Sequence, residues 1–238
     1  MSSPAADPGV DWRLYLVTDP RLGGGPDAVP GIVYQAVLGG VGVVQVRDKE
    51  CDDDEFAARA AAVTGAVRRA SAEVGRHVPV FVNDRLAVAR ELGVHLHVGQ
   101  RDVPYARARA ELPAELMVGL SIESDAQLAT ALGGPWIPPD VIGVSPVWAT
   151  PTKTDTADAL GPDGADRIAR AAHTAPGRPV RAVGIGGVHS GNVGALAETA
   201  LDGVCVVSAI MAAADPRAAA ADLLTAWDRV RPAGPPPR

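Results

Sequence analysis

Eight short apolar runs, rich in Val, Ile and Leu, recur along the chain and are separated by polar or helix-forming segments. Their length is that of strands, and most are apolar throughout rather than alternating between apolar and polar residues. Continuous apolar strands are typical of a parallel sheet whose two faces are both buried. The predicted strands are 13–18, 41–46, 78–82, 94–98, 116–120, 140–145, 180–185 and 203–208.

Segments rich in Ala, Glu and Arg lie between these runs, with apolar residues three and four positions apart, and predict helices. The longest is 56–75, and others are 85–92, 124–134, 165–173 and 215–230. Eight strands, each followed by a helical segment, make up a closed (β/α)8 barrel. A doubly wound open sheet shows the same alternation, so this pattern alone leaves both architectures open.

The length of 238 residues suits a single barrel, and no internal repeat or break in composition indicates a second domain. We therefore predict one TIM-barrel domain over residues 1–238. Residues 1–11 and 231–238 are expected to be flexible tails, because Pro-rich ends of this kind do not continue a helix.

Charge and composition exclude several classes of protein. The formal net charge of −6 argues against a general nucleic-acid binder, which needs basic surface to neutralise phosphates. No run of about 18 apolar residues occurs, so no membrane span is expected. Cys51 and Cys205 make no disulfide framework, and the first residues lack a basic start followed by an apolar run. These features predict a cytoplasmic protein, and they leave open whether it forms a homo-oligomer.

The second predicted strand ends in an alternation of polar residues. Its sequence, VGVVQVRDKE (41–50), begins with a Val-rich run and then carries Gln45, Arg47 and Lys49 at every second position. Side chains two residues apart in a strand point the same way, so these three share one direction. Because active sites of parallel barrels lie at the C-terminal ends of the strands, we expect them to enter the mouth of the barrel.

Polar or glycine-rich residues follow the other predicted strands as well. They are Asn83 and Asp84 after the third, His97, Gln100 and Asp102 after the fourth, Ser121 after the fifth, Thr150, Thr152 and Lys153 after the sixth, Gly186 and Gly187 after the seventh, and Val207 and Ser208 at the eighth. The register of these groups with the strand ends predicts a single site at the barrel mouth.

The chemistry of these residues favours phosphorylated ligands. Arg47, Lys49 and Lys153 are cations suited to a multiply charged anion. Asp84 and Asp102 supply hard oxygen ligands for Mg²⁺, which prefers one or two carboxylates together with substrate phosphates. The glycine pair and Ser208 match the site in which barrels hold a monophosphate on backbone N–H groups. The sequence thus indicates a magnesium–diphosphate site beside a monophosphate site.

Each signal alone also has a simpler interpretation. A cation after a strand is usually a solvated loop charge, and Asp84 could cap the helix that follows it. The segment GIGGVHSG resembles a dinucleotide-binding pattern, but its spacing and late position disfavour that reading. His95 and His97 share one face of a strand, where packing or an outer hydrogen bond is favoured over metal binding.

Taken together, these motifs make the chain resemble the thiamine-phosphate synthase family, barrel enzymes that join the pyrimidine and thiazole halves of thiamine. The resemblance covers nearly the whole chain, from LYLVTD (14–19) to VVSAI (206–210). The motifs that carry it, in order, are QVRDK (45–49), ND (83–84), HVGQRD (97–102), GLS (119–121), TPTKTD (150–155), IGGV (185–188) and VS (207–208).

The resemblance implies a role for each motif residue. Those that would bind the aminopyrimidine diphosphate are Gln45, Arg47, Lys49, Asn83, Ser121 and Lys153. Those that would hold the thiazole phosphate are Thr150, Thr152, Gly187, Val207 and Ser208. Asp84 and Asp102 would hold Mg²⁺ against the diphosphate. Lys153, Ser121 and Arg47 are the candidate catalytic residues. The reaction implied is dissociative: diphosphate leaves, a pyrimidine methylene cation forms, and the thiazole nitrogen captures it.

The chain departs from the family pattern at a few positions. Asp48 stands where the family usually has Glu, Ser145 where Gly is common, and Ala149 where Pro is usual. We include Asp48 among the candidate substrate-binding residues, although strand alternation would turn it away from Gln45, Arg47 and Lys49. Two other functions stay open. One is an isomerase like the related thiazole tautomerase, and the other is a non-catalytic barrel that binds thiamine precursors.

Overall fold

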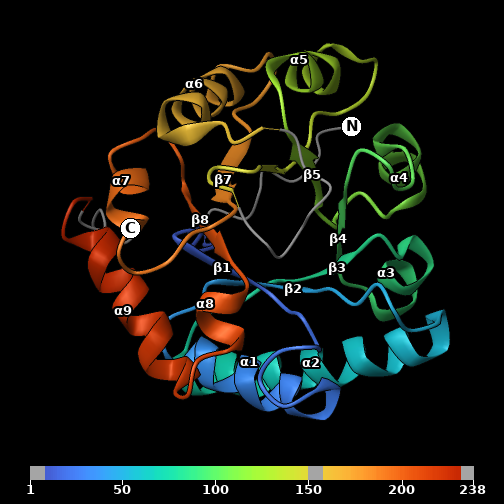
Figure 1. The fold of residues 1–238 in the computed structure, drawn as a ribbon. Coiled ribbons are helices and arrows are strands. Elements are labelled where there is room, and N and C mark those ends of the chain that lie inside the picture. Colours follow the sequence, from blue (N-terminus) through green and yellow to red (C-terminus); the bar gives the residue numbers. More distant parts are fainter. Residues whose placement is uncertain (1–8, 150–157, 232–238) are drawn as a thin grey trace.

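Eight parallel strands close into a barrel in the order β1-β2-β3-β4-β5-β6-β7-β8. The computed structural model describes residues 9–149 and 158–231. The strands are β1 (Leu14–Val17), β2 (Val43–Val46), β3 (Val80–Asn83), β4 (His95–Val98), β5 (Val118–Ile122), β6 (Val141–Val144), β7 (Arg181–Ile185) and β8 (Gly203–Val206). Figure 1 shows the helices arranged around the outside of this barrel. The predicted TIM barrel is confirmed, and because β1 pairs with β8, the open doubly wound sheet is excluded.

Each predicted strand overlaps an observed one, with small shifts at the ends. β5 continues to Ile122 rather than ending at residue 120. Its last residues pair with β6, where Ser121 lies opposite Gly143 and Ile122 opposite Val144. The polar Ser121 is therefore part of the sheet, at the rim of the barrel.

The five predicted helices are all present, as α2 (Asp53–Val74), α3 (Leu86–Leu92), α5 (Asp125–Gly133), α6 (Gly161–His173) and α9 (Pro216–Asp228). The sequence prediction missed the short helix η1 (Pro26–Ala28) and the helices α1 (Val29–Leu38), α4 (Tyr105–Glu111), α7 (Val193–Ala197) and α8 (Ser208–Met211). α1 packs against both α2 and α9. Its sequence is apolar with little polar face, so it lacks the periodicity that identifies a surface helix.

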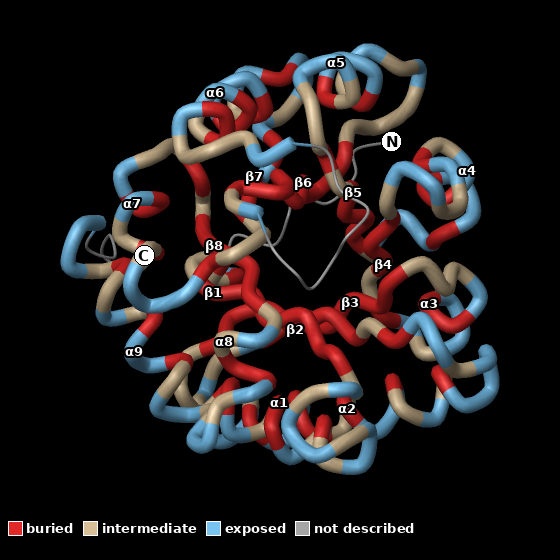
Figure 2. Tube along the Cα trace, viewed as in Figure 1, coloured by how far each residue is buried: buried red, intermediate tan, exposed pale blue. Residues whose placement is uncertain are grey.

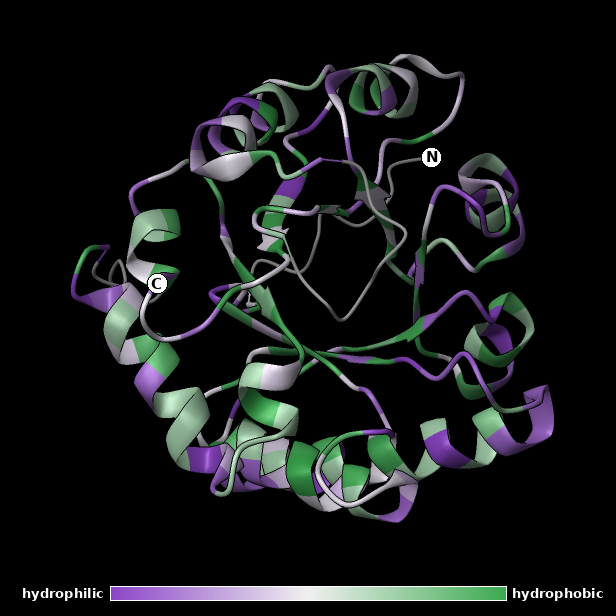
Figure 3. Ribbon diagram, viewed as in Figure 1, coloured by the Kyte–Doolittle hydropathy of each residue, from purple (hydrophilic) through white to green (hydrophobic). Residues whose placement is uncertain are grey.

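The apolar core has two layers. The larger one lies between the strands and the surrounding helices, and the smaller one fills the barrel and includes Trp12, Tyr15, Phe81 and Val183. Figure 2 shows the strands buried, and Figure 3 shows them largely hydrophobic, while the outer faces of the helices are exposed and polar. Burial on both faces explains why the strands do not alternate in sequence.

Aromatic rings close the N-terminal end of the barrel. The ring centroids of Trp12 and Phe81 are 6.3 Å apart, and those of Tyr15 and Phe81 are 5.8 Å apart. Val10, which lies in the predicted N-terminal tail, is buried in the same cluster. Side chains fill this end of the barrel. The opening to solvent lies at the other end, at the C-terminal ends of the strands. No helix within the described ranges is both long and apolar enough to cross a bilayer.

Candidate active site

A cavity of about 390 Å³ opens at the mouth of the barrel. Its size lies within the range of small-molecule sites, about 300–1,000 Å³. The predicted site residues that line it are Gln45, Arg47, Lys49, Asn83, Asp102, Ser121, Gly187, Val207 and Ser208. Side chains far apart in the sequence thus meet in one place, as their register with the strand ends predicted.

Gln45 lies inside the barrel at the floor of this cavity, and its side-chain amide donates a hydrogen bond to the Tyr15 hydroxyl at 3.0 Å. Burial raises the pKa of Tyr15 well above its ordinary value, so the hydroxyl stays neutral. Tyr15 was not predicted as a site residue from the sequence. The Tyr15 side chain points into the barrel, and this direction follows from the register of β1 with β2 and β8, which the sequence does not give.

The predicted metal ligands lie beside Lys49. The Lys49 ammonium is 3.1 Å from Asp84 Oδ2 and 3.8 Å from Asp102 Oδ1. Asp84 has a left-handed backbone with φ of 64°, a conformation that Asp tolerates better than most residues. Asp102 Oδ2 accepts a hydrogen bond from the Gly99 N–H at 2.7 Å, which fixes its orientation.

The two neighbouring carboxyl groups influence each other's ionisation. Burial and the neighbouring Asp102 raise the pKa of Asp84 to about 6, despite the opposing charge of Lys49. Burial opposes ionisation of Asp102 too, but the hydrogen bond with Asp84, the Gly99 N–H and Lys49 together lower its pKa. Asp84 Oδ1 is buried with no hydrogen-bond partner among the described residues. An acidic pair with an unsatisfied oxygen is suited to a hard divalent cation.

The protein side chains alone do not complete a metal site. Within residues 9–149 and 158–231, no group of three or more His, Cys, Asp or Glu side chains is placed to hold a metal ion. Mg²⁺ nevertheless commonly binds to only two protein carboxylates, because substrate phosphates and water complete its coordination shell. The residues present therefore fit Mg²⁺ bound together with a phosphorylated ligand.

The charge of Asp84 should lower the stability of the metal-free protein. A carboxyl whose pKa is raised from 3.8 to about 6 by folding favours the folded state below pH 4, and this benefit disappears as pH rises through 6. We expect Asp84→Asn to raise the free energy of unfolding by about 1–3 kcal/mol at pH 8, and the gain to shrink toward pH 4. Denaturant melts at both pH values, without divalent cations, measure this.

Asp125→Asn is the matched control, because Asp125 is exposed and paired with Arg167 on the surface. It should change stability little at either pH. An Asp84→Asn protein no more stable than the parent at pH 8 would contradict the interpretation that this buried charge opposes folding.

Ser121 lies on another side of the cavity, where two neighbours fix it. His97 Nε2 is 3.0 Å from the Ser121 hydroxyl, and the Gln100 side-chain amide donates to the Ser121 carbonyl at 2.6 Å. His97 lines the cavity, and a Cβ on Gly119 would lie 2.5 Å from its ring, so that glycine leaves room for the imidazole. The hydrogen bond predicted for His97 therefore joins a candidate site residue directly.

Gly186 and Gly187 form a tight turn after β7, with φ of 111° and 66°. A Cβ on Gly187 would lie 2.9 Å from Trp148 Cβ, so no larger residue fits without a shift. Asn192 holds the turn, donating to the Gly187 carbonyl at 2.9 Å and accepting from the His189 N–H at 2.8 Å. α8 begins at Ser208 on the same cavity. Loops after the seventh and eighth strands form the usual phosphate site of TIM barrels.

Not every predicted residue lines the cavity. The predicted metal ligand Asp84 is not among the lining residues, although its carboxylate contacts Lys49, which is. Asp48 does not line it; its carboxylate is turned to the outside of the barrel, where it pairs with Arg59 of α2. The alternation along the strand end explains this, because Asp48 falls between Arg47 and Lys49. Thr150, Thr152 and Lys153 lie outside the described residues, so their predicted roles stay predictions.

The chain is similar to known proteins of one family. Residues 14–210 match the family model described as thiamine monophosphate synthase. The chain is 39% identical over 219 residues to the thiamine-phosphate synthase of Albidiferax ferrireducens, covering 92% of this chain and 93% of that protein. The solved structure of thiamine phosphate pyrophosphorylase from Pyrococcus furiosus is 26% identical with a TM-score of 0.76, covering 93% of this chain and 98% of that one.

A longer relative is also similar. The chain is 48% identical over 225 residues to a thiamine biosynthesis multifunctional protein of Corynebacterium efficiens. The match covers 93% of this chain but only 29% of that protein. The chain thus spans less than a third of this relative.

Proposed function

The chain belongs to the thiamine monophosphate synthase family, and from that premise we propose that it joins an aminopyrimidine diphosphate to a thiazole phosphate, giving thiamine phosphate and diphosphate. One observation supports this most strongly. A single cavity is lined by Arg47, Lys49 and Asp102 on one side, with Asp84 in contact with Lys49, and by the turns at Gly187 and Ser208 on another. A reaction between two phosphorylated molecules needs such a pair of anion sites around one space.

The diphosphate would bind at the end of β2. Arg47 offers a planar guanidinium that matches phosphate oxygens in pairs, and Lys49 offers a point charge. The Lys49 ammonium is paired with Asp84 and Asp102. We propose that these carboxylates hold Mg²⁺ when the diphosphate is bound, which leaves the ammonium to contact the phosphate. When bound, the ion would neutralise charge on the departing diphosphate.

The pyrimidine would lie deeper in the cavity, against groups that can form neutral hydrogen bonds. Gln45, Asn83 and Ser121 all line the cavity and carry amide or hydroxyl groups. These recognise a ring with both donor and acceptor atoms. Apolar side chains such as Val17 and Val183 line the same space and would limit access of water to a methylene cation. Capture of that cation by a neutral thiazole nitrogen needs no strong base to activate the nucleophile.

The direct test mixes purified protein with both substrates and Mg²⁺ and measures thiamine phosphate by chromatography. Omitting either substrate is the control, and the proposal predicts that only the complete mixture yields product. An isomerase like thiazole tautomerase would convert the thiazole phosphate without the pyrimidine. A non-catalytic barrel would bind one or both ligands and release them unchanged. Either result in place of product formation would reject the synthase assignment.

The two anion sites predict different defects. Arg47→Ala removes charge-assisted hydrogen bonds to the diphosphate and should weaken binding of the pyrimidine substrate about 10–100-fold. Gly187→Val places a branched side chain where a Cβ already meets Trp148, and should mainly weaken thiazole phosphate binding. Calorimetric titration with each ligand separately measures this. Arg167→Ala, an exposed residue of α6, is the control. An equal loss of affinity for both ligands in both variants would mean that the two anion sites are not separate.

A further inference from the structure

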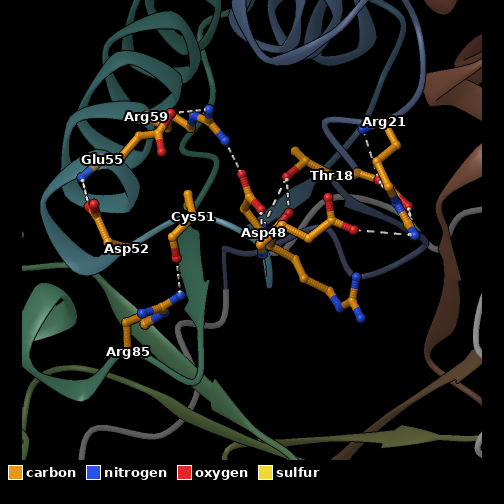
Figure 4. A network of polar contacts seen from close by, with 11 residues as sticks. Thr18, Arg21, Asp48, Cys51, Asp52, Glu55, Arg59 and Arg85 are labelled. Atoms are coloured by element: carbon orange, nitrogen blue, oxygen red, sulfur yellow. Dashed lines mark hydrogen bonds and ion pairs between the residues drawn. The ribbon is translucent and has the colours of Figure 1, made fainter.

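The segment between β2 and α2 presents Arg47 and Lys49 to the cavity, and its opposite side is held by buried polar contacts. Both cations are on long side chains, and Lys49 is half exposed. Their direction is therefore set by the backbone from which they extend. Figure 4 shows the residues behind this segment, with Asp48 between Thr18 and the Arg59 side chain.

Thr18, at the end of β1, fixes the backbone of Arg47. The Arg47 N–H donates to the Thr18 hydroxyl at 3.0 Å, and the hydroxyl is 3.4 Å from the Arg47 carbonyl. The Thr18 N–H in turn donates to the Gln45 carbonyl at 2.9 Å. Thr18 is almost fully buried, so these contacts are shielded from water. The backbone of Arg47, the residue before Asp48, is thus hydrogen-bonded to the end of β1.

Asp48 fixes the residues that follow. Its side chain is only 4% exposed, and its carboxylate accepts the Glu50 N–H at 3.0 Å. Burial raises the pKa of Asp48, but the Glu50 N–H, the Cys51 thiol and Arg59 together lower it. Opposite these groups the carboxylate forms an ion pair with Arg59. Asp48 therefore stabilises the turn that carries Lys49 and connects this turn to α2.

Arg59 lies on α2, an element that can serve as a rigid support. α2 is 22 residues long, with Asp52 capping its first turn through the Glu55 N–H and with Phe56, Ala60 and Val63 buried in the core. Arg59 has a second partner, the exposed Glu55, which does not touch the turn. The guanidinium thus connects the cation-bearing turn to a helix that the barrel core holds in place.

From this geometry we propose that Asp48 and Arg59 act as a positioning pair, which holds Arg47 and Lys49 in the direction needed to bind the diphosphate; the inference rests on the proposed function. Neither partner lines the mouth cavity, so the pair acts through the turn and not by contact with substrate. A buried carboxylate that loses its cation favours a rearranged turn in which it reaches water. A small displacement of Arg47 and Lys49 would then weaken anion binding.

The test compares the parent protein with Arg59→Met, Asp48→Asn, the double variant and Arg59→Lys. Glu55→Gln is the matched control, because it removes the other partner of Arg59 and leaves Asp48 paired. Calorimetry with pyrophosphate and Mg²⁺ gives Kd, and steady-state rates give KM for each substrate and kcat. Thermal melts establish which variants are folded. In Asp48→Asn a side-chain oxygen can still accept the Glu50 N–H. This variant therefore tests the proposal if Arg59→Met does not fold.

We expect Arg59→Met and Asp48→Asn to raise the Kd for pyrophosphate and the KM for the pyrimidine diphosphate about 10-fold, with kcat and the KM for thiazole phosphate changed much less. The double variant should be no worse than the singles, and Arg59→Lys should recover most of the affinity. Unchanged affinity for pyrophosphate in folded variants would overturn the proposal that Asp48 and Arg59 position the two cations. An equal rise in the KM for both substrates would overturn it as well. Failure of the proposed function is distinct, because it would appear in the parent protein as absence of product.

Discussion

Replacing Asp102 with Asn should lower kcat/KM for thiamine phosphate formation about 10³-fold while the barrel stays folded. Asp102 is held by the Gly99 N–H and lies beside Lys49 and Asp84, so it is placed to share a cation with Asp84. The substitution keeps the shape and the hydrogen-bonding oxygen but removes the charge that attracts Mg²⁺. Only a loop carboxylate at the barrel mouth is changed, so the apolar core is unaffected.

Initial rates over a range of Mg²⁺ concentrations measure this effect, and circular dichroism melts check the fold. Asp125→Asn is the control, because it neutralises an exposed carboxylate of α5 away from the cavity. Chelation of divalent cations should inactivate the parent protein to a similar extent. Normal turnover of Asp102→Asn, or of the parent protein in excess chelator, would reject the magnesium assignment.

Lys153→Ala should reduce kcat about 10²–10³-fold, a loss comparable to that of one oxyanion donor. Lys153 belongs to the TPTKTD segment that follows β6 and lies outside the described residues, so this prediction rests on the sequence motif. A cation that acts on the departing diphosphate stabilises charge that grows in the transition state. Ground-state binding is shared with Arg47 and Lys49, so affinity for the substrate should fall much less.

Single-turnover rates at saturating substrate separate the chemical step from binding. Lys153→Arg, which keeps the positive charge, should retain more activity than the alanine variant. Weaker diphosphate binding with normal kcat would mean that Lys153 is an ordinary binding residue.

Much of this fold was predictable because its strands are buried on both faces and stand out as continuous apolar runs. The alternation of Gln45, Arg47 and Lys49 also predicted correctly that the three side chains line one cavity, although β2 itself ends at Val46. α1 was missed for the same physical reason that made the strands visible. It is apolar along its length because α2 and α9 cover it, so no polar face marked it as a helix.

Other features depend on register and distance, which a sequence does not contain. Tyr15 looks like any apolar strand residue until pairing with β2 brings it to the Gln45 amide. The raised pKa of Asp84 requires the two carboxyl groups to be close and partly buried, although 17 residues lie between them in the chain. Asp48 was included among the binding residues by its motif, whereas Arg59, a distant helix residue, determines where its carboxylate lies.

The central claim is that one cavity holds a magnesium diphosphate and a monophosphate on separate sides. A crystal structure of the protein with Mg²⁺, pyrophosphate and thiamine phosphate tests it most directly. We expect pyrophosphate to lie against Arg47 and Lys49, a magnesium ion to be held by Asp84 and Asp102, and the phosphate of thiamine phosphate to lie on the turns at Gly187 and Ser208. Pyrophosphate bound at Gly187 and Ser208, with no ion at the acidic pair, would contradict it.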